Sequence, residues 1–393
     1  MNEIELKRYF SRGLLEWYRA SKRDLPWRRS RDPYHIWVSE IMLQQTRVDT
    51  VIPYFNRFVE RFPTVRDLAE APEEEVLKLW EGLGYYSRAR NLQAAAKQVT
   101  ERYGGRVPDD KDAVSGLKGV GPYTAGAIMS IAFNRPVPAV DGNVMRVLSR
   151  YFCIDDDIAR PSTRAKMEVL AEELIPEGAA GDFNQALMEL GALVCTPRSP
   201  HCLTCPVMEH CAGRLAGRET ELPVKSRAKP PKPQHRLAVL AARPDGRVLV
   251  RQRPERGLLA RMWELPHVEA ADAESWQSDE AGPDWLAGAL AAEGLRVHPR
   301  RYVGEAEHVF SHLHWFLRVW EADGAEFALP AGQGRGQAAV HEHSALYGAG
   351  TSDGPVPPTP DRYRWVNREE FEALAWPNVF RKILGDYFAR QAR

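Results

Sequence analysis

The sequence predicts a protein of two domains, an all-α N-terminal domain followed by an α+β C-terminal domain. Up to about residue 220 the apolar residues follow a helical period in capped segments. Residues 222–235 are then rich in proline and lysine, which suits an extended linker. Beyond the linker, short runs alternate between apolar and polar residues, as strands do. The predicted domains are therefore residues 1–221 and 236–393.

The bulk composition is that of an ordinary globular protein. Of the 393 residues, 44% are hydrophobic and 27% are charged, and 53 basic residues balance 53 acidic ones. No apolar stretch reaches the roughly 18 residues that cross a bilayer, and the first residues lack the pattern of a signal peptide. We therefore expect a cytosolic protein with no membrane partner. The balanced charge gives no indication for or against nucleic acid.

A helix start is clearest at Asp32-Pro33, an N-cap followed by proline at the first helical position. This signal predicts a helix from Tyr34 to about Val51 that stops at Pro53.

A second helical feature lies between Leu117 and Ala127, which reads as a helix end, a Gly-Val-Gly turn and a new helix that begins at Pro122. Such a turn exposes backbone N–H groups at a helix N-terminus, where they bind a phosphate. For this pattern taken alone, a plain helix–helix turn remains the alternative.

Strand signals mark the second domain. Arg236–Ala242 and Arg247–Arg253 are short strand-like runs joined across Pro244-Asp245-Gly246, which predicts a hairpin. His312–Trp320 alternates with period two. Residues 331–360 are rich in Gly, Ala, Ser and Pro, and we expect them to form a disordered insertion.

Four of the five cysteines lie within 17 residues in a C-x6-C-x2-C-x5-C spacing, at Cys195, Cys202, Cys205 and Cys211. Four thiolates on one loop suit a single soft metal centre, and the expected cytosolic compartment disfavours disulfides. An iron–sulfur cluster and a zinc ion both remain open. Zinc sites mostly use two close cysteine pairs and this loop has one, so the spacing favours the cluster.

Two carboxylates are candidates for catalysis. Glu40 lies on the helix after Asp32 with apolar residues one turn away, so it is either a surface residue or a buried acid with a raised pKa. Asp141 lies in the run Val140–Val144, twenty residues after Gly121. Its alternatives are a simple Asp-Gly turn and a second catalytic carboxylate.

The order of hairpin, aspartate turn and cysteine loop resembles the helix-hairpin-helix DNA glycosylases, which carry a four-iron, four-sulfur cluster at the place of this loop. Within that superfamily the chain resembles the A/G-specific adenine glycosylase (MutY) family over nearly its whole length. The residues that carry the resemblance are Leu25-Pro26-Trp27-Arg28, Trp37 to Thr46, Gly82 to Asn91, the hairpin, the Asp141 turn and Phe183-Asn184-Gln185-Ala186.

The resemblance implies an enzyme that flips a mispaired adenine out of DNA and hydrolyses its glycosidic bond. Glu40 would protonate the departing adenine and then activate water, while Asp141 would stabilise an oxocarbenium-like transition state. Relatives that also cut the backbone carry a lysine where this chain has Tyr123, which implies hydrolysis by water. The residues implied to bind substrate or DNA are Trp27, Arg28, Gln45, Tyr85, Lys118, Gly119, Gly121, Tyr123, Asn143, Gln185, Phe310, Ser311 and His312. Among them, Gln45 and Tyr85 match positions that enter the base stack near the lesion in the resembled family.

The second domain resembles the Nudix fold, yet the G-x5-E-x7-R-E-x2-E-E pattern of that family is missing between Gly257 and Gly294. We expect this domain to read a base and to hydrolyse nothing. Phe310-Ser311-His312 stands where the resembled family reads 8-oxoguanine, although these residues also suit a plain strand start. The implied partner is double-stranded DNA with adenine opposite 8-oxoguanine or guanine, bound by a monomer in the bacterial cytosol.

Two other functions compete with this interpretation. A DNA-binding or electron-transfer protein that uses the cluster for redox sensing would need no pair of carboxylates. A glycosylase that also cuts the backbone at oxidised pyrimidines is disfavoured by Tyr123 and by the whole second domain.

Overall fold

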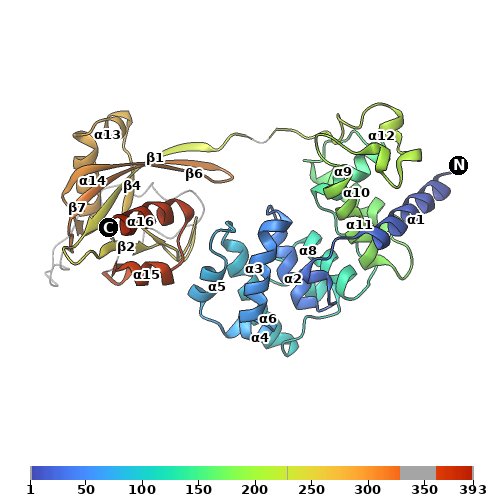
Figure 1. Cartoon of the computed structure of the whole chain (residues 1–393), viewed down its shortest axis with the longest axis horizontal. Helices are drawn as coiled ribbons and strands as arrows, with labels where there is room; N and C mark the ends of the chain where they lie inside the picture. The colour runs from blue at the N-terminus through green and yellow to red at the C-terminus, as the bar shows by residue number, and fades with distance from the viewer. Residues whose placement is uncertain (1, 228, 328–359, 392–393) are drawn as a thin grey trace, which may run out of the picture. The chain divides into compact units, whose positions relative to one another are not determined.

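Helices build the N-terminal part of the computed structural model, drawn in blue to green in Figure 1. The structure describes residues 2–227, 229–327 and 360–391, so nearly all of the insertion expected at 331–360 lies outside the described residues. The chain divides into two units, one of Met1–Leu79 and Arg88–Ala228, the other of Trp80–Ser87 and Lys229–Arg393. None of the described helices is both long and apolar enough to cross a membrane.

The first unit contains α1 (Glu3–Ser21), η1 (Pro26–Arg28), α2 (Pro33–Leu43), α3 (Val48–Arg61), α4 (Val65–Glu70), α5 (Glu73–Leu79), α6 (Ser87–Tyr103), α7 (Lys111–Ser115), α8 (Pro122–Ala127), the π-helical turn η2 (Ile128–Ala132), α9 (Gly142–Tyr151), α10 (Pro161–Leu174), α11 (Ala180–Leu193), η3 (Cys202–Thr204), η4 (Met208–His210) and α12 (Ala212–Leu215). Helices α1, α9, α10 and α11 share one apolar core.

Helix α2 lies in the interior of this unit. It begins as predicted, because the Asp32 carboxylate accepts hydrogen bonds from the N–H groups of Tyr34 (2.8 Å) and His35 (3.3 Å), and proline occupies the first position. Every residue from Tyr34 to Met42 except His35 is buried. A helix buried on nearly all sides also buries any acid that it carries.

The predicted end of this helix is wrong. Helix α2 ends at Leu43, Gln45 adopts a left-handed backbone with φ 60°, and a new helix, α3, begins at Val48. Pro53 lies inside α3 and does not terminate it. The missing proline N–H removes one backbone hydrogen bond, a loss that the packing of α3 tolerates.

The second unit contains β1 (Lys232–Ala242), β2 (Val248–Gln252), β3 (Trp263–Glu264), β4 (His267–Glu269), α13 (Ala273–Gln277), α14 (Ala281–Ala292), β5 (Leu295–Arg296), β6 (Pro299–Val309), β7 (Leu313–Asp323), β8 (Glu326–Phe327), η5 (Pro360–Arg362), β9 (Tyr363–Val366), α15 (Arg368–Ala373) and α16 (Asn378–Gln391). The predicted fold class, all-α followed by α+β, is confirmed.

A mixed sheet organises this unit, with strand order β3-β2-β1-β7-β6, β4 beside β1 and β9 beside β2. Strands β1 and β7 are parallel from Lys232 opposite Leu313 to Ala242 opposite Asp323. Helix α14 packs in the apolar cluster on one side of the sheet, and α15 and α16 pack in the cluster on the other. The predicted hairpin is present as the antiparallel pair of β1 and β2.

Strand β1 starts at Lys232, inside the segment expected to be a linker. Pro233 is tolerated there because this end of β1 pairs with β7 alone, whereas β4 joins only from Arg236 onward.

Candidate active site and cysteine-lined site

Two carboxyl groups and a tyrosine come together in the first unit. Glu40 lies on α2 with 5% of its surface exposed, and the Tyr123 hydroxyl on α8 donates a hydrogen bond of 2.5 Å to Glu40 Oε2. The same hydroxyl lies 3.2 Å from Met188 Sδ on α11. Asp141 at the start of α9 is close enough for its charge to act on Glu40. The structure thus brings together three of the predicted site residues.

Burial governs the protonation of Glu40. Removal of the carboxyl group from water raises its pKa to about 7, although the hydrogen bond from Tyr123 lowers the pKa in part. The charge of Asp141 adds to the rise and that of Arg28 opposes it. A carboxyl group with a pKa near neutrality both holds and releases a proton at neutral pH, as a general acid must.

Glu40 should also make stability depend on pH. Because its folded-state pKa of about 7 exceeds the ordinary 4.5, the folded protein binds the proton more tightly than the unfolded chain does. Stability is therefore expected to fall as the pH rises from about 4.5 towards 7, by about 3 kcal/mol at most. Glu40→Gln should remove this part of the pH dependence, which chemical denaturation at a series of pH values measures. A free-energy difference between variant and wild type that stays constant with pH would contradict it.

Asp141 caps helix α9. Its Oδ1 accepts from the Val144 N–H and its Oδ2 from Asn143 Nδ2, both at 2.8 Å. Burial raises the pKa of Asp141, while these hydrogen bonds act against the rise. More hydrogen-bond donors serve Asp141 than serve Glu40, and such donors favour the ionised form of a carboxyl group.

Arg28 is held by an acid that the sequence patterns do not single out. Both oxygens of Glu189 on α11 accept hydrogen bonds from Arg28, at 3.1 and 2.8 Å, and Arg23 donates to them as well. Burial alone would raise the pKa of Glu189, but the hydrogen bonds from the two arginines outweigh it and lower the pKa to about 2. One feature of the sequence could have pointed to Glu189: it follows Gln185 by one helical turn within an apolar run.

Two further residues implied to bind substrate or DNA, Trp27 and Gln185, also lie in the first unit. Trp27 is buried and packs edge-on against Phe55, with ring centroids 5.4 Å apart. Gln185 is half-buried on α11, and its Nε2 donates to the Gly181 carbonyl at 3.2 Å.

The predicted hairpin connects α7 and α8. Gly119 has φ 76°, and a Cβ at this position would lie 2.6 Å from Asn91 Cβ, so only glycine fits. Gly121 precedes α8 and is exposed, as is Lys118, whose N–H donates to Gln98 Oε1 at 2.8 Å. The turn is therefore shaped by both backbone conformation and close packing.

Gln45 and Tyr85 are both exposed side chains on a left-handed backbone, with φ 60° and 48°. Non-glycine residues adopt this conformation uncommonly, so the surrounding chain must hold both residues in it. Tyr85 belongs to the second unit, together with Phe310, Ser311 and His312, whereas Glu40 belongs to the first.

Ser311 and His312 form the exposed turn between β6 and β7. Ser311 Oγ and His312 Nδ1 are 3.3 Å apart. Phe310, next to them, packs edge-on against the buried Trp315 at 4.9 Å between ring centroids. Phe310 therefore anchors a turn that leaves a hydroxyl group and an imidazole ring open to solvent.

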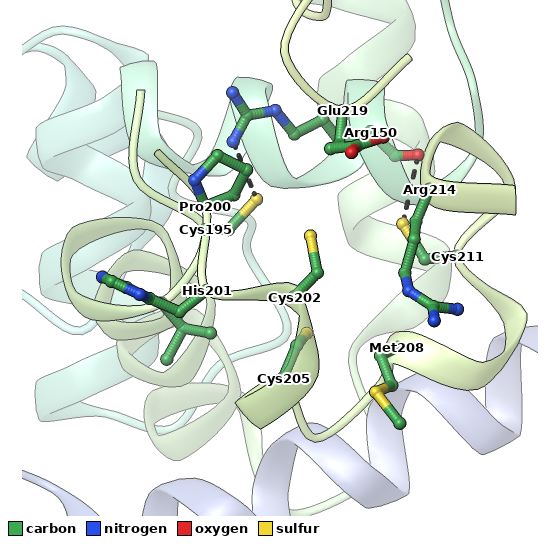
Figure 2. Close-up of a pocket in the computed structure, with 11 residues that line it drawn as sticks. Arg150, Cys195, Pro200, His201, Cys202, Cys205, Met208, Cys211, Arg214 and Glu219 are labelled. Atoms are coloured by element: carbon green, nitrogen blue, oxygen red, sulfur yellow. Dashed lines mark hydrogen bonds between the residues drawn. The ribbon is translucent and has the colours of Figure 1, made fainter. Parts of the chain in front are cut away.

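The four clustered cysteines line one pocket, with their sulfur atoms on its walls, as Figure 2 shows. Each is a free thiol, and they lie on the loop from the end of α11 to the start of α12. Burial and the charges of the other three thiols together raise the pKa of Cys205 to about 12, against a hydrogen bond from the Val207 N–H that lowers it. Ionised together, these sulfurs require a positively charged centre among them.

The donor set of this pocket fits an iron–sulfur cluster. Four thiols from one loop line its walls. Cysteine thiolates in a set of four are the ligands of a four-iron, four-sulfur cluster.

Helix α9 connects this pocket to Asp141. It begins after Asp141 and carries Arg150, whose guanidinium donates to Cys195 Sγ (3.3 Å) and to the Thr196 carbonyl (2.7 Å). Arg146, one turn earlier, donates to the Cys195 carbonyl at 2.8 Å. The cysteine loop therefore supports the helix that places Asp141.

Three regions of the chain match known families. Residues 38–176 match the HhH-GPD superfamily of base excision DNA repair proteins, residues 195–211 the iron–sulfur binding domain of endonuclease III, and residues 237–386 the NUDIX domain. The second match begins at Cys195 and ends at Cys211. These matches confirm the predicted 4Fe-4S cluster and resolve the choice between cluster and zinc.

Relatives match over most of the chain. The adenine DNA glycosylase of Homo sapiens is 36% identical, over 97% of this chain and 74% of the relative. That of Rattus norvegicus is 36% identical over 96% and 78%, and that of Schizosaccharomyces pombe is 35% identical over 81% and 82%.

Proposed function

The chain belongs to the adenine DNA glycosylase family of base excision repair enzymes, and from this premise we propose that it removes adenine paired with 8-oxoguanine or guanine. Removal of adenine from DNA is the activity of the family. The identity of the opposing base and the roles of single residues are the proposal. The hydrogen bond from Tyr123 to the buried Glu40, beside Asp141, carries the chemical part of it.

The bond between adenine N9 and C1′ of the sugar breaks with Glu40 as the acid. Glu40 gives its proton to N7, so that adenine leaves as a neutral base and takes the bonding electrons. The sugar becomes oxocarbenium-like, and the Asp141 carboxylate stabilises its positive charge. Ionised Glu40 then accepts a proton from the water that adds to C1′.

Tyr123 makes the enzyme hydrolytic. Its hydroxyl, held between Glu40 and Met188, has a pKa raised by burial and by the neighbouring carboxylates, so it stays protonated and is a poor nucleophile. No amine stands at this place of the hairpin to form a Schiff base with the sugar. The product is therefore an abasic site with an intact backbone.

The cysteine loop has a supporting role in this scheme. Cys195, Cys202, Cys205 and Cys211 hold the 4Fe-4S cluster, which when bound cross-links the loop. Arg146 and Arg150 transmit that support to α9 and Asp141.

The exposed turn of Ser311 and His312 supports reading of the opposing base. 8-Oxoguanine differs from guanine by an O8 acceptor and an N7–H donor, and a hydroxyl group with neighbouring backbone groups can bind both. Phe310 fixes the turn through Trp315, so its polar groups are preorganised.

The double variant Ser311→Ala, His312→Ala tests this reading. We expect it to lower excision of adenine opposite 8-oxoguanine roughly five- to hundredfold, the value of about 1–3 kcal/mol for a base contact, and to change excision opposite guanine little. Single-turnover rates on the two duplexes measure the ratio. Equal losses on both duplexes would show that the turn is structural.

A further inference from the structure

The segment Trp80–Ser87, which connects α5 and α6, belongs by its contacts to the unit formed by Lys229–Arg393. We infer that Glu81 is a positioning residue, which fixes this segment to the C-terminal unit and so sets the place of Tyr85. This inference rests on the proposed function in one respect, the assignment of Tyr85 to the base stack. It makes Tyr85 part of the unit that we propose reads the opposing base.

Both oxygens of Glu81 are bound by that unit. Oε1 accepts from the Trp376 N–H at 2.9 Å, and Oε2 accepts from Arg381 Nη1 at 2.6 Å. The Tyr86 hydroxyl donates to the carbonyl of Trp376 at 3.2 Å. Segment Trp80–Ser87 thus binds both backbone polar groups of one residue, Trp376.

Trp376, to which the segment Trp80–Ser87 binds, is firmly packed in the C-terminal unit. The Trp376 side chain is fully buried, and its Nε1 donates to the Phe371 carbonyl at 2.8 Å. It packs in the apolar core with Phe380 and Leu384 of α16, the helix that carries Arg381. A segment tied to this core moves with it.

The buried carboxylate of Glu81 needs its ion pair with Arg381 to offset the cost of burial. Its side chain is 4% exposed, whereas that of Arg381 is 46% exposed. A buried carboxylate costs much free energy unless charged and backbone donors satisfy it, so loss of a donor weakens the whole attachment.

The segment passes this constraint on to Tyr85. Trp80 Nε1 donates to the Gly84 carbonyl, and the Gly82 N–H donates to the Tyr86 hydroxyl, both at 3.2 Å. Between these fixed residues Tyr85 keeps its left-handed backbone and leaves 47% of its surface exposed. A Tyr85 held in this way is ready to enter a base stack with little loss of conformational entropy.

The test uses the full-length holoprotein with Glu81→Gln, Arg381→Met and the double variant. Glu75→Gln is the matched control, because Glu75 forms a more exposed ion pair with Arg61 on α3. Three quantities are measured: hydrogen exchange of the peptide 80–87, fluorescence of 2-aminopurine placed beside the opposing base, and single-turnover adenine excision. The first reports attachment of the segment, and the second reports insertion of Tyr85.

We expect roughly two- to thirtyfold faster exchange in 80–87 and a similar slowing of insertion and excision for Glu81→Gln and Arg381→Met. The double variant should change these rates little more than either single variant does, because each single substitution already breaks the contact between Glu81 and Arg381. Arg381→Lys should recover most of the loss, and Glu75→Gln should match wild type.

If exchange and fluorescence stay unchanged in both single variants while Tyr85→Ala slows excision, this inference fails and the proposed function stands. If Tyr85→Ala leaves excision unchanged, the assigned role of Tyr85 fails, and the exchange of 80–87 still decides whether Glu81 fixes the segment. Should Glu81→Gln fold poorly, Arg381→Met, a change at a half-exposed side chain, carries the test.

Discussion

Glu40→Gln is expected to bind duplex DNA containing adenine opposite 8-oxoguanine about as tightly as wild type and to release adenine roughly 10²- to 10⁴-fold more slowly. The amide keeps the size of the side chain and still accepts the hydrogen bond from Tyr123. It has no proton to give to adenine N7. The whole loss is therefore expected in the chemical step, which single-turnover excision measures, while a binding titration measures DNA affinity.

Glu60→Gln is a suitable control, because Glu60 is an exposed glutamate on the neighbouring helix α3. Its excision rate should equal that of wild type. If Glu40→Gln excises adenine at the normal rate, Glu40 is not the acid. If it loses binding as well, the carboxyl group has a structural role that burial alone did not indicate.

Asp141→Asn should slow adenine release roughly 10²- to 10³-fold, because the positive charge on the sugar loses its fixed negative partner. Asparagine caps helices as well as aspartate does, so the hydrogen bond from Val144 and the start of α9 should survive. The free energy of unfolding is therefore expected to change little. Single-turnover rates together with thermal melting measure the two effects.

This variant makes a second prediction testable by pH. The charge of Asp141 contributes to the raised pKa of Glu40, so its removal should lower that pKa. The pH above which excision declines should then move below about 7. A rate loss without such a movement would place Asp141 away from Glu40 in the working enzyme.

Local signals made the start of α2 predictable, whereas its end also depends on a contact far away in sequence. Asp32 and Pro33 are neighbours of the helix that they begin. The end at Leu43 depends on Gln45 and on Arg88 of α6, whose Nη1 lies 2.6 Å from the Gln44 carbonyl. The predicted helix therefore ran through the turn that separates α2 from α3.

The site was predictable where the spacing of one residue type implies a chemistry, as for the cysteine loop. The burial of Glu40 was not, because it comes from packing of α2 against several helices of the first unit. The pairing of Glu189 could not be predicted, because its partners Arg23 and Arg28 are some 160 residues away in sequence. The attachment of Glu81 to Trp376 is more distant still.

The most direct test of the account is excision by the full-length protein of adenine placed opposite 8-oxoguanine, guanine and thymine in otherwise identical duplexes. Strands are resolved before and after alkali, which cuts only at abasic sites. The account predicts abasic sites opposite 8-oxoguanine and guanine, none opposite thymine, and no strand cleavage until alkali is added. Equal excision opposite thymine, or cleavage without alkali, would contradict it.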